Sequence, residues 1–530
     1  MSHLNNQISW WSELMNNSKD KLTLSLATIS ILIFAILWRR WNSLSSSYGA
    51  LSLPPGPYSL PIVGYLPFLG RDLHTQFRDM AHTYGPIFKF HLGSKLHVVI
   101  NTSDLAKVVV REQDDIFANR NPSIAALTIS YGGQDVVFSD NNSDWRNLRK
   151  IFAHEVLSKK NLEGSRYFRR DEVRRTIKNI YSKIGTTIDI SEIAFSTEAN
   201  VLTRMVWENT SDPNSKGSNF GAAELQKIAL NIVELLGQPN LSDIFPTLAW
   251  LDLHGIAKKM KKQFHQLDEF FTSIINDRII SNSKKLNDVV AHEGKKDLLQ
   301  ILLELVDQKD ATSISITQMK AILLDVMVAG TETTTTLIDW AMAEIMQNHH
   351  IMKRIQEELA EIVGLDNIVE ESHLPKLQYL DATIKETFRL HPVVPLILPR
   401  SPSQDCIVGG YTIPKGCTVF MNVWSMHRDP KYWDNPLEFN PERFLINKCD
   451  FKGSNLNFIP FGSGRRLCPG VALAEKMQMY ILASLLHSFD WSLPEGEEHD
   501  LSEKFGITLK KREPLMAVPS QRLPNESLYL

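Results

Sequence analysis

The sequence predicts a mainly α protein, in which one large helical domain with a small β region follows a single N-terminal transmembrane helix. Three observations support this prediction. Most of the chain carries apolar residues at helical spacing, strand-like segments are few and short, and one uninterrupted apolar run lies near the N-terminus. The chain has 530 residues, of which 43% are hydrophobic and 22% are charged. This composition excludes a disordered chain and a polytopic membrane protein.

Charge and cysteine content exclude further classes of protein. The formal net charge is −3 at pH 7, so no basic excess points to a nucleic acid partner. The four cysteines are Cys406, Cys417, Cys449 and Cys468, and none of them is in CxxC spacing. This pattern argues against a zinc ribbon, a thioredoxin-type site and a secreted disulfide framework.

The apolar run over residues 22–38 (LTLSLATISILIFAILW) predicts a transmembrane anchor. At about 1.5 Å per residue it spans roughly 26 Å, near the lower limit for crossing a bilayer. Tryptophans flank it as interfacial aromatics would, at Trp10, Trp11, Trp38 and Trp41. A cleaved signal peptide is the alternative. Residues 1–21 precede the run, however, and Arg39-Arg40 stands where small residues would mark a cleavage site, so an uncleaved anchor is predicted.

Residues 39–61 are predicted to be a linker that ends in a stiff hinge. The hinge contains Pro54, Pro55, Pro57 and Pro61. Each proline fixes φ and removes an amide donor. No second linker or internal repeat follows, so residues 62–530 are predicted to form one domain. Helices are predicted over 104–113, 142–160, 222–237, 257–281, 316–348, 350–363 and 377–390. Strands are predicted over 87–92 and 96–101, as a β-hairpin, and over 396–400, 405–413 and 417–420.

The strongest motif is a glycine-rich loop that delivers one cysteine to the start of a helix. It runs from Phe461 to Gly470 (FGSGRRLCPG), and its cysteine is Cys468. Pro469 suits the first turn of a helix, where a backbone N–H would have no hydrogen-bond partner within the helix. The amides at a helix start stabilise a thiolate. A cysteine that is buried for structural reasons alone would not require the spacing FxxGxRxCxG.

This loop resembles that of the cytochrome P450 family of haem-thiolate monooxygenases. The resemblance implies the cytochrome P450 fold and haem b (iron protoporphyrin IX) as the cofactor. It makes Cys468 the axial ligand of the haem iron, and it adds Phe461 and Arg466 as cofactor-binding residues, with Arg466 paired to a propionate. The resemblance covers roughly residues 51 to 525. The stretches at 130–138 and 239–246 resemble the plant microsomal branch that oxidises sesquiterpenes and flavonoids.

A second motif, Ala329 to Thr334 (AGTETT), lies inside the long apolar helix expected from Ile316. An acid and an alcohol among apolar residues are costly to bury unless they are used. Gly330 removes a side chain and could leave room for a small ligand. The resemblance makes this the oxygen-binding kink, with Glu332 and Thr333 as the catalytic proton relay. The alternative is a solvated helix face with threonines bonded back to the helix.

Six further positions match the family in the same way. The ExxR pair Glu386 and Arg389 is expected to form, with Arg443, a buried ion-pair triad that holds the fold. The same pattern at Glu172 and Arg175 is treated as a coincidence.

Trp145 and Arg149 are four residues apart and share one helical face. The resemblance implies that both reach a haem propionate, and Arg400 matches another propionate-binding arginine. The alternative for these three residues is a core aromatic and surface charge.

The resemblance also predicts the pocket, the substrate and the partners. The pocket positions are almost all apolar and include no lysine or arginine, namely Ile124–Tyr131, Leu324, Met327, Ala329, Val394, Leu396, Ile397 and Phe505–Ile507. A small apolar substrate is therefore expected. The sequence carries no GxGxxG after a strand and no P-loop, so electrons are expected from NADPH through a separate NADPH-cytochrome P450 reductase. A basic docking face is expected at Arg146, Arg149, Lys150, Lys159 and Lys160.

The expected function is the O2-dependent hydroxylation of an apolar plant specialised metabolite, most plausibly a sesquiterpene-type terpenoid or a flavonoid. The alternatives are a haem-thiolate isomerase or dehydratase that works without O2, and a non-enzymatic membrane haem-binding protein. The acid–alcohol pair at Glu332 and Thr333 favours the monooxygenase. The resemblance places the protein in the endoplasmic reticulum membrane as a single-pass protein, with residues 1–21 in the lumen and the catalytic domain in the cytosol.

Overall fold

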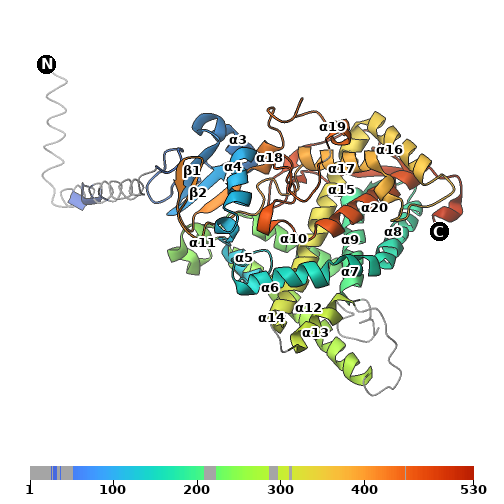
Figure 1. Cartoon of the computed structure of the whole chain (residues 1–530), viewed down its shortest axis with the longest axis horizontal. Coiled ribbons are helices and arrows are strands. Elements are labelled where there is room, and N and C mark those ends of the chain that lie inside the picture. The colour runs from blue at the N-terminus through green and yellow to red at the C-terminus, as the bar shows by residue number, and fades with distance from the viewer. Residues whose placement is uncertain are drawn as a thin grey trace, which may run out of the picture.

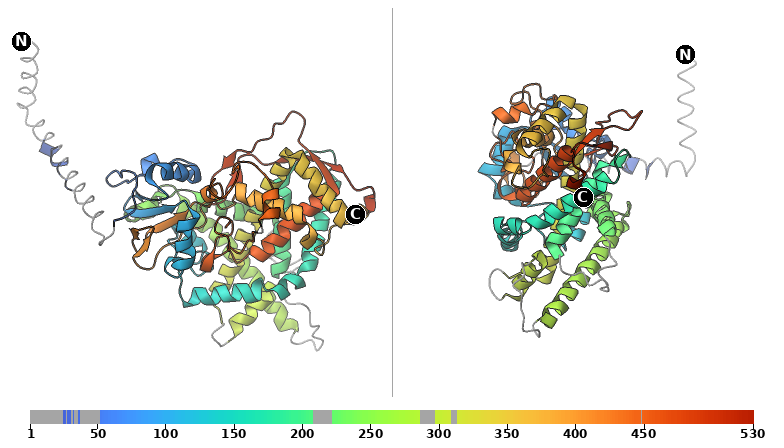
Figure 2. Two further views of the ribbon diagram at one scale, coloured as in Figure 1. Left: turned by 45° about the horizontal axis from the view of Figure 1, so that its top comes forward. Right: turned by 90° about the vertical axis from the view of Figure 1, so that its right-hand side faces the viewer.

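The computed structural model describes residues 52–207, 222–285, 297–308, 313–447 and 449–530, together with scattered residues between 25 and 36. A broad body of helices makes up most of the molecule, and a small sheet lies at the end where the chain enters it (Figure 1, Figure 2). The predicted segment 1–21, most of the anchor at 22–38 and the linker up to residue 51 lie outside the described residues. The described anchor residues are helical and exposed. The mainly α fold is confirmed.

The central element is the long helix that the sequence places over 316–348. It begins at α14 (Ile316–Leu324), continues through one π-helical turn, η7 (Asp325–Ala329), and ends with α15 (Gly330–Gln347). Ser315 caps its start, because its hydroxyl accepts from the Gln318 amide while the Gln318 side chain accepts in return. Among the described residues this is the one stretch apolar and long enough to cross a membrane, but 83% of it is buried inside the protein. It is therefore the core helix, packed on α9 (Ile190–Trp207) and α20 (Val471–Ser488).

The other helices surround this core. They are α3 (Leu73–Tyr84), α4 (Ser103–Lys107), α5 (Ile124–Ile129), α6 (Ser143–Ile151), α7 (Lys159–Gly164), α8 (Arg166–Tyr181), α10 (Ala222–Gly237), α11 (Leu241–Ile244), α12 (Ile256–Lys285), α13 (Leu298–Asp307), α16 (His349–Ile362), α17 (Gln378–Leu390), α18 (Val423–Met426) and α19 (Glu442–Ile446). Helices predicted over 222–237, 257–281, 350–363 and 377–390 match α10, α12, α16 and α17. The helix predicted over 142–160 is instead two helices, because a π turn follows α6 and Ser158 caps a new start at α7.

The predicted hairpin is confirmed and forms the main sheet. β1 (Ile87–Leu92) pairs antiparallel with β2 (Lys95–Ile100), and β2 pairs in parallel with β6 (Thr418–Met421). The predicted strand over 405–413 is a smaller hairpin, in which Gly409-Gly410 separates β4 (Cys406–Val408) from β5 (Tyr411–Ile413). Near the C-terminus, β10 (Met516–Gln521) lies between β3 (Ile188–Asp189) and β7 (Phe489–Ser492), and β8 (Glu503–Lys504) pairs with β9 (Lys510–Lys511).

The strand predicted over 396–400 is wrong. This segment makes one isolated bridge, between Arg400 and Val419. Pro399 has no N–H to donate to a ladder, and Ile397 has φ 41°, which is incompatible with an extended strand. The apolar pattern of the segment therefore reflects burial against the core and not strand pairing.

Candidate active site

The cysteine loop folds tightly before α20. The Cys468 amide donates to the Phe461 carbonyl oxygen at 3.0 Å, which closes the loop. Gly464 has φ +70°, and a Cβ there would lie 2.3 Å from the Val110 carbonyl oxygen. Only glycine fits this position, because any other side chain would be strained and would collide with a neighbouring backbone.

The Cys468 thiol lies deep in the protein but keeps accessible surface. Burial raises its pKa, while the Gly470 N–H and the nearby Arg149 act in the opposite direction. The Gly470 N–H donates to Sγ at 3.3 Å. The residue is only half-buried, whereas the other three cysteines are buried. Burial raises the pKa of Cys406 to about 11 and of Cys417 to about 12.

At the predicted AGTETT motif, part of the surface of the core helix is accessible. Residues on both sides of the motif are buried, yet Ala329 is exposed and Gly330 and Thr333 are half-buried. These three positions share one side of the helix, since residues four apart are neighbours on its surface. The Thr333 hydroxyl donates to the Ala329 carbonyl at 2.7 Å. The π turn η7 ends where this open side begins, as π turns often do at functional sites.

Two sequence expectations for this motif are modified by the structure. A Cβ on Gly330 would lie 2.8 Å from Leu202 Cδ1, so this glycine allows α9 to pack closely against α15 and does not make room for a ligand. Glu332 is buried and faces away from the open side, where its carboxylate forms an ion pair with Lys510 of β9. No hydrogen bond links the Glu332 and Thr333 side chains among the described residues.

Four buried or half-buried arginines converge beside the cysteine loop. Three of them are the predicted Arg149, Arg400 and Arg466, and the fourth is Arg120. Arg149 donates to the Leu467 carbonyl oxygen, next to the cysteine. Arg400 donates to Asp114 at 2.9 Å, and Arg466 donates to the Ala118 carbonyl oxygen at 2.7 Å.

Arg120 was missed by sequence reasoning. It comes from the segment before α5 and donates to the carbonyl oxygens of Leu398 at 2.7 Å and Pro399 at 2.9 Å. It therefore ties its own segment to the one that carries Arg400. No short sequence motif marks it.

The arginine cluster carries more positive charge than the protein neutralises. Burial, followed by repulsion from Arg400, lowers the pKa of Arg466 to about 9. Burial and repulsion from Arg466 and Arg400 lower the pKa of Arg120 well below its usual value. Among the described residues, only Arg400 of the four forms an ion pair with a carboxylate. Haem is a flat group with two carboxylates and an iron that binds a thiolate. Its carboxylates would supply the missing negative charge, so the residues present fit haem.

Trp145 belongs to the same cluster. The Asn142 side chain caps α6 by accepting from the Trp145 amide, which fixes where the helix begins. The indole Nε1 donates to the Val136 carbonyl oxygen at 3.0 Å. Trp145 and Arg149 lie on one face of α6 as the spacing predicts, with Trp145 buried and Arg149 directed to the cysteine loop.

The predicted triad is present, with Glu386 and Arg389 fully buried and the Arg443 side chain 11% exposed. Arg389 Nε and Nη2 donate to the two Glu386 carboxylate oxygens at 2.7 and 2.8 Å, and Arg443 Nε donates to Oε1 at 3.0 Å. Arg389 also donates to the carbonyl oxygens of His427 and Pro436, so it joins α17 to the segment before α19. The pair at Glu172 and Arg175 is indeed different, because the Arg175 side chain is 69% exposed.

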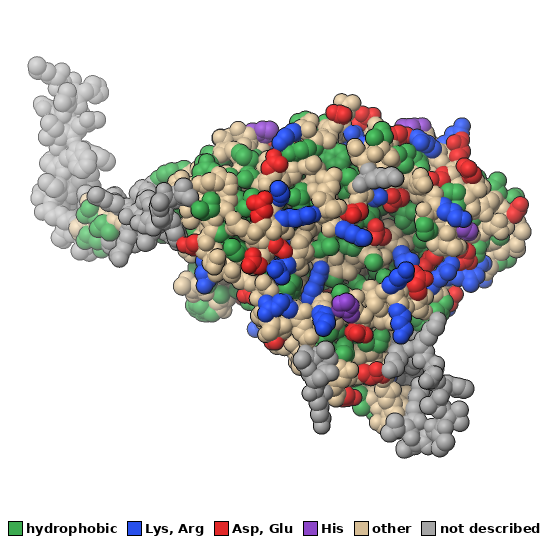
Figure 3. Space-filling model, viewed as in Figure 1, with side chains coloured by type: hydrophobic (Ala, Val, Ile, Leu, Met, Phe, Trp, Pro, Cys, Tyr) green, Lys and Arg blue, Asp and Glu red, His purple; other side chains and the backbone are tan. Residues whose placement is uncertain are grey.

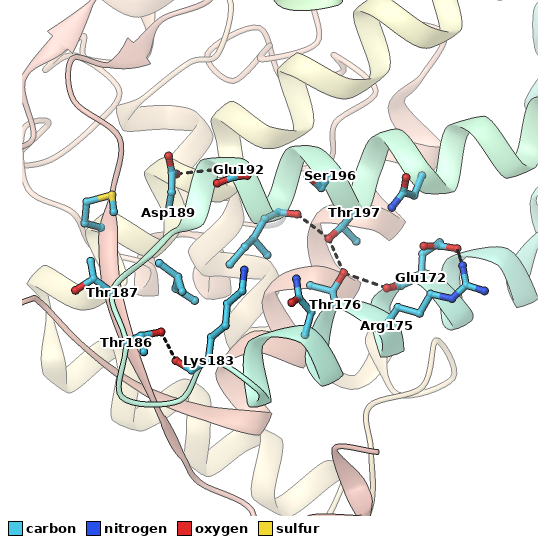
Figure 4. A pocket seen from close by; sticks show the side chains of 15 residues that line it. Glu172, Arg175, Thr176, Lys183, Thr186, Thr187, Asp189, Glu192, Ser196 and Thr197 are labelled. Carbon is cyan, nitrogen blue, oxygen red and sulfur yellow. Dashed lines mark hydrogen bonds and ion pairs between the residues drawn. The ribbon is translucent and has the colours of Figure 1, made fainter. Parts of the chain in front are cut away.

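Glu172 and Arg175 instead line a polar surface pocket of about 670 Å³ between α8 and α9 (Figure 4). Thr176 and Thr197 face each other there at 2.7 Å, and charged and hydroxyl side chains make up most of the wall. None of the arginines beside the cysteine loop lines it, and neither do Cys468 and Thr333. This pocket is therefore separate from the candidate active site.

The C-terminal segment brings several predicted pocket positions together. The Leu509 amide donates to the Val393 carbonyl oxygen at 2.8 Å, which joins the segment after β8 to the one that holds Val394. Phe505 and Leu396 pack into the same apolar cluster. Residues more than one hundred positions apart in sequence thus lie side by side.

Comparison with known proteins agrees with this geometry. The model of the cytochrome P450 family matches residues 54–518. A flavonoid 3'-monooxygenase of Crocosmia x crocosmiiflora is 36% identical and covers 96% of this chain and 99% of its own. Geraniol 8-hydroxylase of Catharanthus roseus is 37% identical, with 93% and 99% covered. A zebra fish cytochrome P450 structure with abiraterone has 26% identity and a TM-score of 0.71, and covers 86% of this chain and 100% of its own. The chain therefore belongs to the cytochrome P450 family, whose members are haem-thiolate monooxygenases that take their electrons from a reductase.

Proposed function

We propose that this protein hydroxylates an apolar plant specialised metabolite, either a terpenoid or a flavonoid. Relatives of both kinds have similar identity, since one is named a flavonoid 3'-monooxygenase and another geraniol 8-hydroxylase. The observation that carries the proposal is the accessible side of the core helix at Ala329 and Thr333, inside an otherwise buried apolar helix. Its one polar side-chain group is the Thr333 hydroxyl, and Cys468 is likewise only half-buried.

The cofactor would be held by residues of three separate segments. Cys468 would ligate the iron, Arg149, Arg400 and Arg466 would neutralise the propionates, and Trp145 and Phe461 would lie beside them. When bound, the haem supplies the chemistry of O2 activation, which thiolate ligation promotes. The protein excludes water from the predicted pocket and orients the substrate over the accessible helix face. It also keeps the Cys468 sulfur in contact with the Gly470 N–H, which stabilises its negative charge.

Proton delivery is assigned to Thr333 and Glu332. The Thr333 hydroxyl is the polar group on the accessible side of the helix and can turn from the Ala329 carbonyl toward the predicted pocket. Glu332 would act as the proton store behind it. A positioned proton donor speeds such a step by about 10²–10⁴-fold.

The electron donor is proposed to be an NADPH-cytochrome P450 reductase that docks on the basic residues of α6 and α7. Arg146, Lys150, Lys159 and Lys160 are exposed, whereas Arg149 is turned inward to the cysteine loop. Lysine and arginine side chains gather along the lower part of the face shown in Figure 3, over these helices. Complementary charge of this kind raises the rate of encounter with an acidic partner.

The site of action is proposed to be the endoplasmic reticulum membrane, with residues 22–38 as the single anchor and residues 62–530 as the cytosolic catalytic domain. An exposed apolar patch supports contact with lipid, and it comprises Leu248, Trp250, Leu251 and Leu253. Trp250 is 81% exposed, which is unusual for so large an apolar side chain. The patch follows α11, which lies against the β1–β2 turn at the end of the molecule where the described chain begins (Figure 1).

The test is an assay of microsomes that contain this protein and a reductase. Terpene alcohols, sesquiterpenes and flavonoids are screened for a substrate-induced shift of the Soret band and for products that require both NADPH and O2. The proposal expects at least one apolar compound to give both signals. Turnover without NADPH or O2, or binding of charged compounds alone, would overturn it.

A further inference from the structure

The hairpin β8–β9 connects the predicted substrate pocket to the core helix. Its turn carries Phe505 and Ile507, two of the predicted pocket positions. Trp340 of α15 donates from Nε1 to the Leu509 carbonyl oxygen at 2.8 Å, and both residues are buried. The hairpin therefore lies directly on the helix that carries Thr333.

One charge contact joins this hairpin to the proposed proton relay. Lys510 of β9 forms an ion pair with Glu332. The Glu332 side chain is 4% exposed, whereas that of Lys510 is 38% exposed. A carboxylate buried to this degree is costly without a cationic partner, so the contact with Lys510 stabilises the buried position of the Glu332 side chain. The Lys510 ammonium group also lies between the buried Glu332 carboxylate and solvent.

The ion pair fixes the direction of the Glu332 side chain. Residues 332 and 333 are consecutive on a helix, so their side chains point about 100° apart. The Thr333 hydroxyl donates to the Ala329 carbonyl oxygen on the accessible side of the helix, and the Glu332 carboxylate lies toward β9. Glu332 can reach the hydroxyl only if its contact with Lys510 loosens or if water links the two groups.

The other strand of the hairpin is firmly held. Glu503 accepts from His74 Nε2 at 3.0 Å and from Trp424 Nε1 at 3.4 Å, and these residues come from α3 and α18. The His74 ring stacks on Phe505 at 5.2 Å between ring centroids. The segment at β9 is held as well, because the Leu509 amide donates to the Val393 carbonyl oxygen and Trp340 Nε1 donates to the Leu509 carbonyl oxygen, so the hairpin fixes the position of Lys510.

We propose that Lys510 is a positioning residue that orients Glu332 for proton delivery. The proposal rests on the proposed relay role of Glu332 and Thr333. Lys510 holds the buried Glu332 carboxylate on the β9 side of the core helix. Without Lys510, Glu332 loses this orientation and proton delivery becomes less efficient. More of the electrons from NADPH then end in hydrogen peroxide instead of product.

The variants that test this proposal differ in whether they keep the side-chain charge and in which residue they replace. Lys510→Met keeps the length of the side chain and removes its charge, and Lys510→Arg keeps the charge. The matched control is Lys504→Met, because Lys504 lies directly opposite Lys510 in the hairpin register but is exposed and forms no ion pair among the described residues. Glu332→Gln removes the charge of the acid itself.

Four measurements are made on the haem-loaded protein: product per NADPH, peroxide per NADPH, the solvent deuterium isotope effect, and the thermal midpoint. Lys510→Met is expected to lower product per NADPH about threefold to tenfold and to raise peroxide and the isotope effect. Lys510→Arg should restore most of the loss, and Lys504→Met should match wild type. The thermal midpoints of Lys510→Met and Glu332→Gln should not add in the double variant, because both remove the same pair.

The outcomes separate the two proposals. If Glu332→Gln leaves coupling unchanged, the relay itself is wrong. If Glu332→Gln uncouples the enzyme but Lys510→Met does not, the relay stands and the role of Lys510 is overturned. Additive midpoints, or equal effects of Lys510→Met and Lys504→Met, would also overturn it.

Discussion

The guanidinium group of Arg466 lies 4.0 Å from the centre of the Trp145 indole ring. Both side chains also donate to the Val136 carbonyl oxygen, Trp145 at 3.0 Å and Arg466 at 3.3 Å. The Val136 amide in turn donates to Asp325 in the π turn of the core helix at 2.8 Å. One residue of the segment after α5 thus joins the cysteine loop, α6 and the core helix.

This arrangement predicts the effect of Arg466→Leu. The variant loses a cation that the structure leaves without a carboxylate partner, so haem content should fall several-fold while the fold survives. The ratio of Soret to protein absorbance measures this. Arg465→Leu is the matched control, because Arg465 stands next in the same loop but its side chain is 52% exposed. Equal haem content in both variants would contradict the proposed role of Arg466.

Cys468→Ser should abolish the long-wavelength Soret band that thiolate ligation gives to the reduced carbon monoxide complex. An alcohol is a poor ligand for iron and cannot supply the electron density of a thiolate. Cys406→Ser, Cys417→Ser and Cys449→Ser should retain the band, since those thiols are buried in packed side chains. A normal spectrum in Cys468→Ser would refute the ligand assignment.

Thr333→Ala should uncouple electron use from product formation. The substitution removes the one hydroxyl on the open side of the helix and keeps helix propensity high, so haem binding should persist. Water replaces the hydroxyl in part, and the loss of product per NADPH should be on the order of tenfold, below the full range for acid–base steps. Product and peroxide are measured against NADPH consumed. Unchanged coupling would mean that this threonine serves only to bond back to Ala329.

Arg389→Ala should destabilise the protein severely. It leaves Glu386 charged and buried with half of its hydrogen bonds lost, and breaking such a pair costs about 3–5 kcal/mol. Arg175→Ala should cost less than about 1 kcal/mol, because the Arg175 side chain is 69% exposed and Glu172 keeps its ion pair with Arg204. Urea unfolding of the two variants gives the comparison. Similar midpoints would show that burial does not distinguish these two ExxR pairs.

Glu198 of α9 predicts how stability depends on pH. Burial raises the pKa of its carboxyl to about 8 from 4.5, opposed by Arg169, and its Oε2 has no hydrogen-bond partner. Between these two values the folded protein holds a proton that the unfolded chain releases. The free energy of unfolding therefore falls as pH rises through this window, by about 1.4 kcal/mol per pH unit from this group.

Glu198→Gln should remove that part of the slope, because an amide does not titrate. Urea unfolding of wild type and variant at pH 5.5 and pH 7.5 tests this. The wild type should lose more stability than the variant across the interval, and parallel losses would contradict the assignment.

The sequence predicted the chemistry of the site better than its geometry. The loop around Cys468 and the motif at Glu332 and Thr333 are short, and their residue types are demanded by the reaction, so they stand out without a structure. The long helices were predicted well for a related reason, since an amphipathic or apolar period persists over many residues. The segment at 396–400 failed because an apolar run reports burial and not the pairing of a strand.

Three features were decided by contacts between distant residues. Arg120 joins the arginine cluster from a segment with no motif, and Gly330 is required by the approach of Leu202 from α9. Lys510 reaches Glu332 from 178 positions further along the chain, because β9 packs on the core helix.

The sequence by itself determined the family and predicted the iron ligand and the acid–alcohol pair, because each depends on residue types at fixed short spacing. Only the tertiary structure decided which side of the core helix is open, which arginines lack a carboxylate partner, and which cation holds Glu332. Those properties depend on burial and on charge separation between segments, and the free energy of a buried charge depends on what surrounds it in space, which spacing along a chain does not encode.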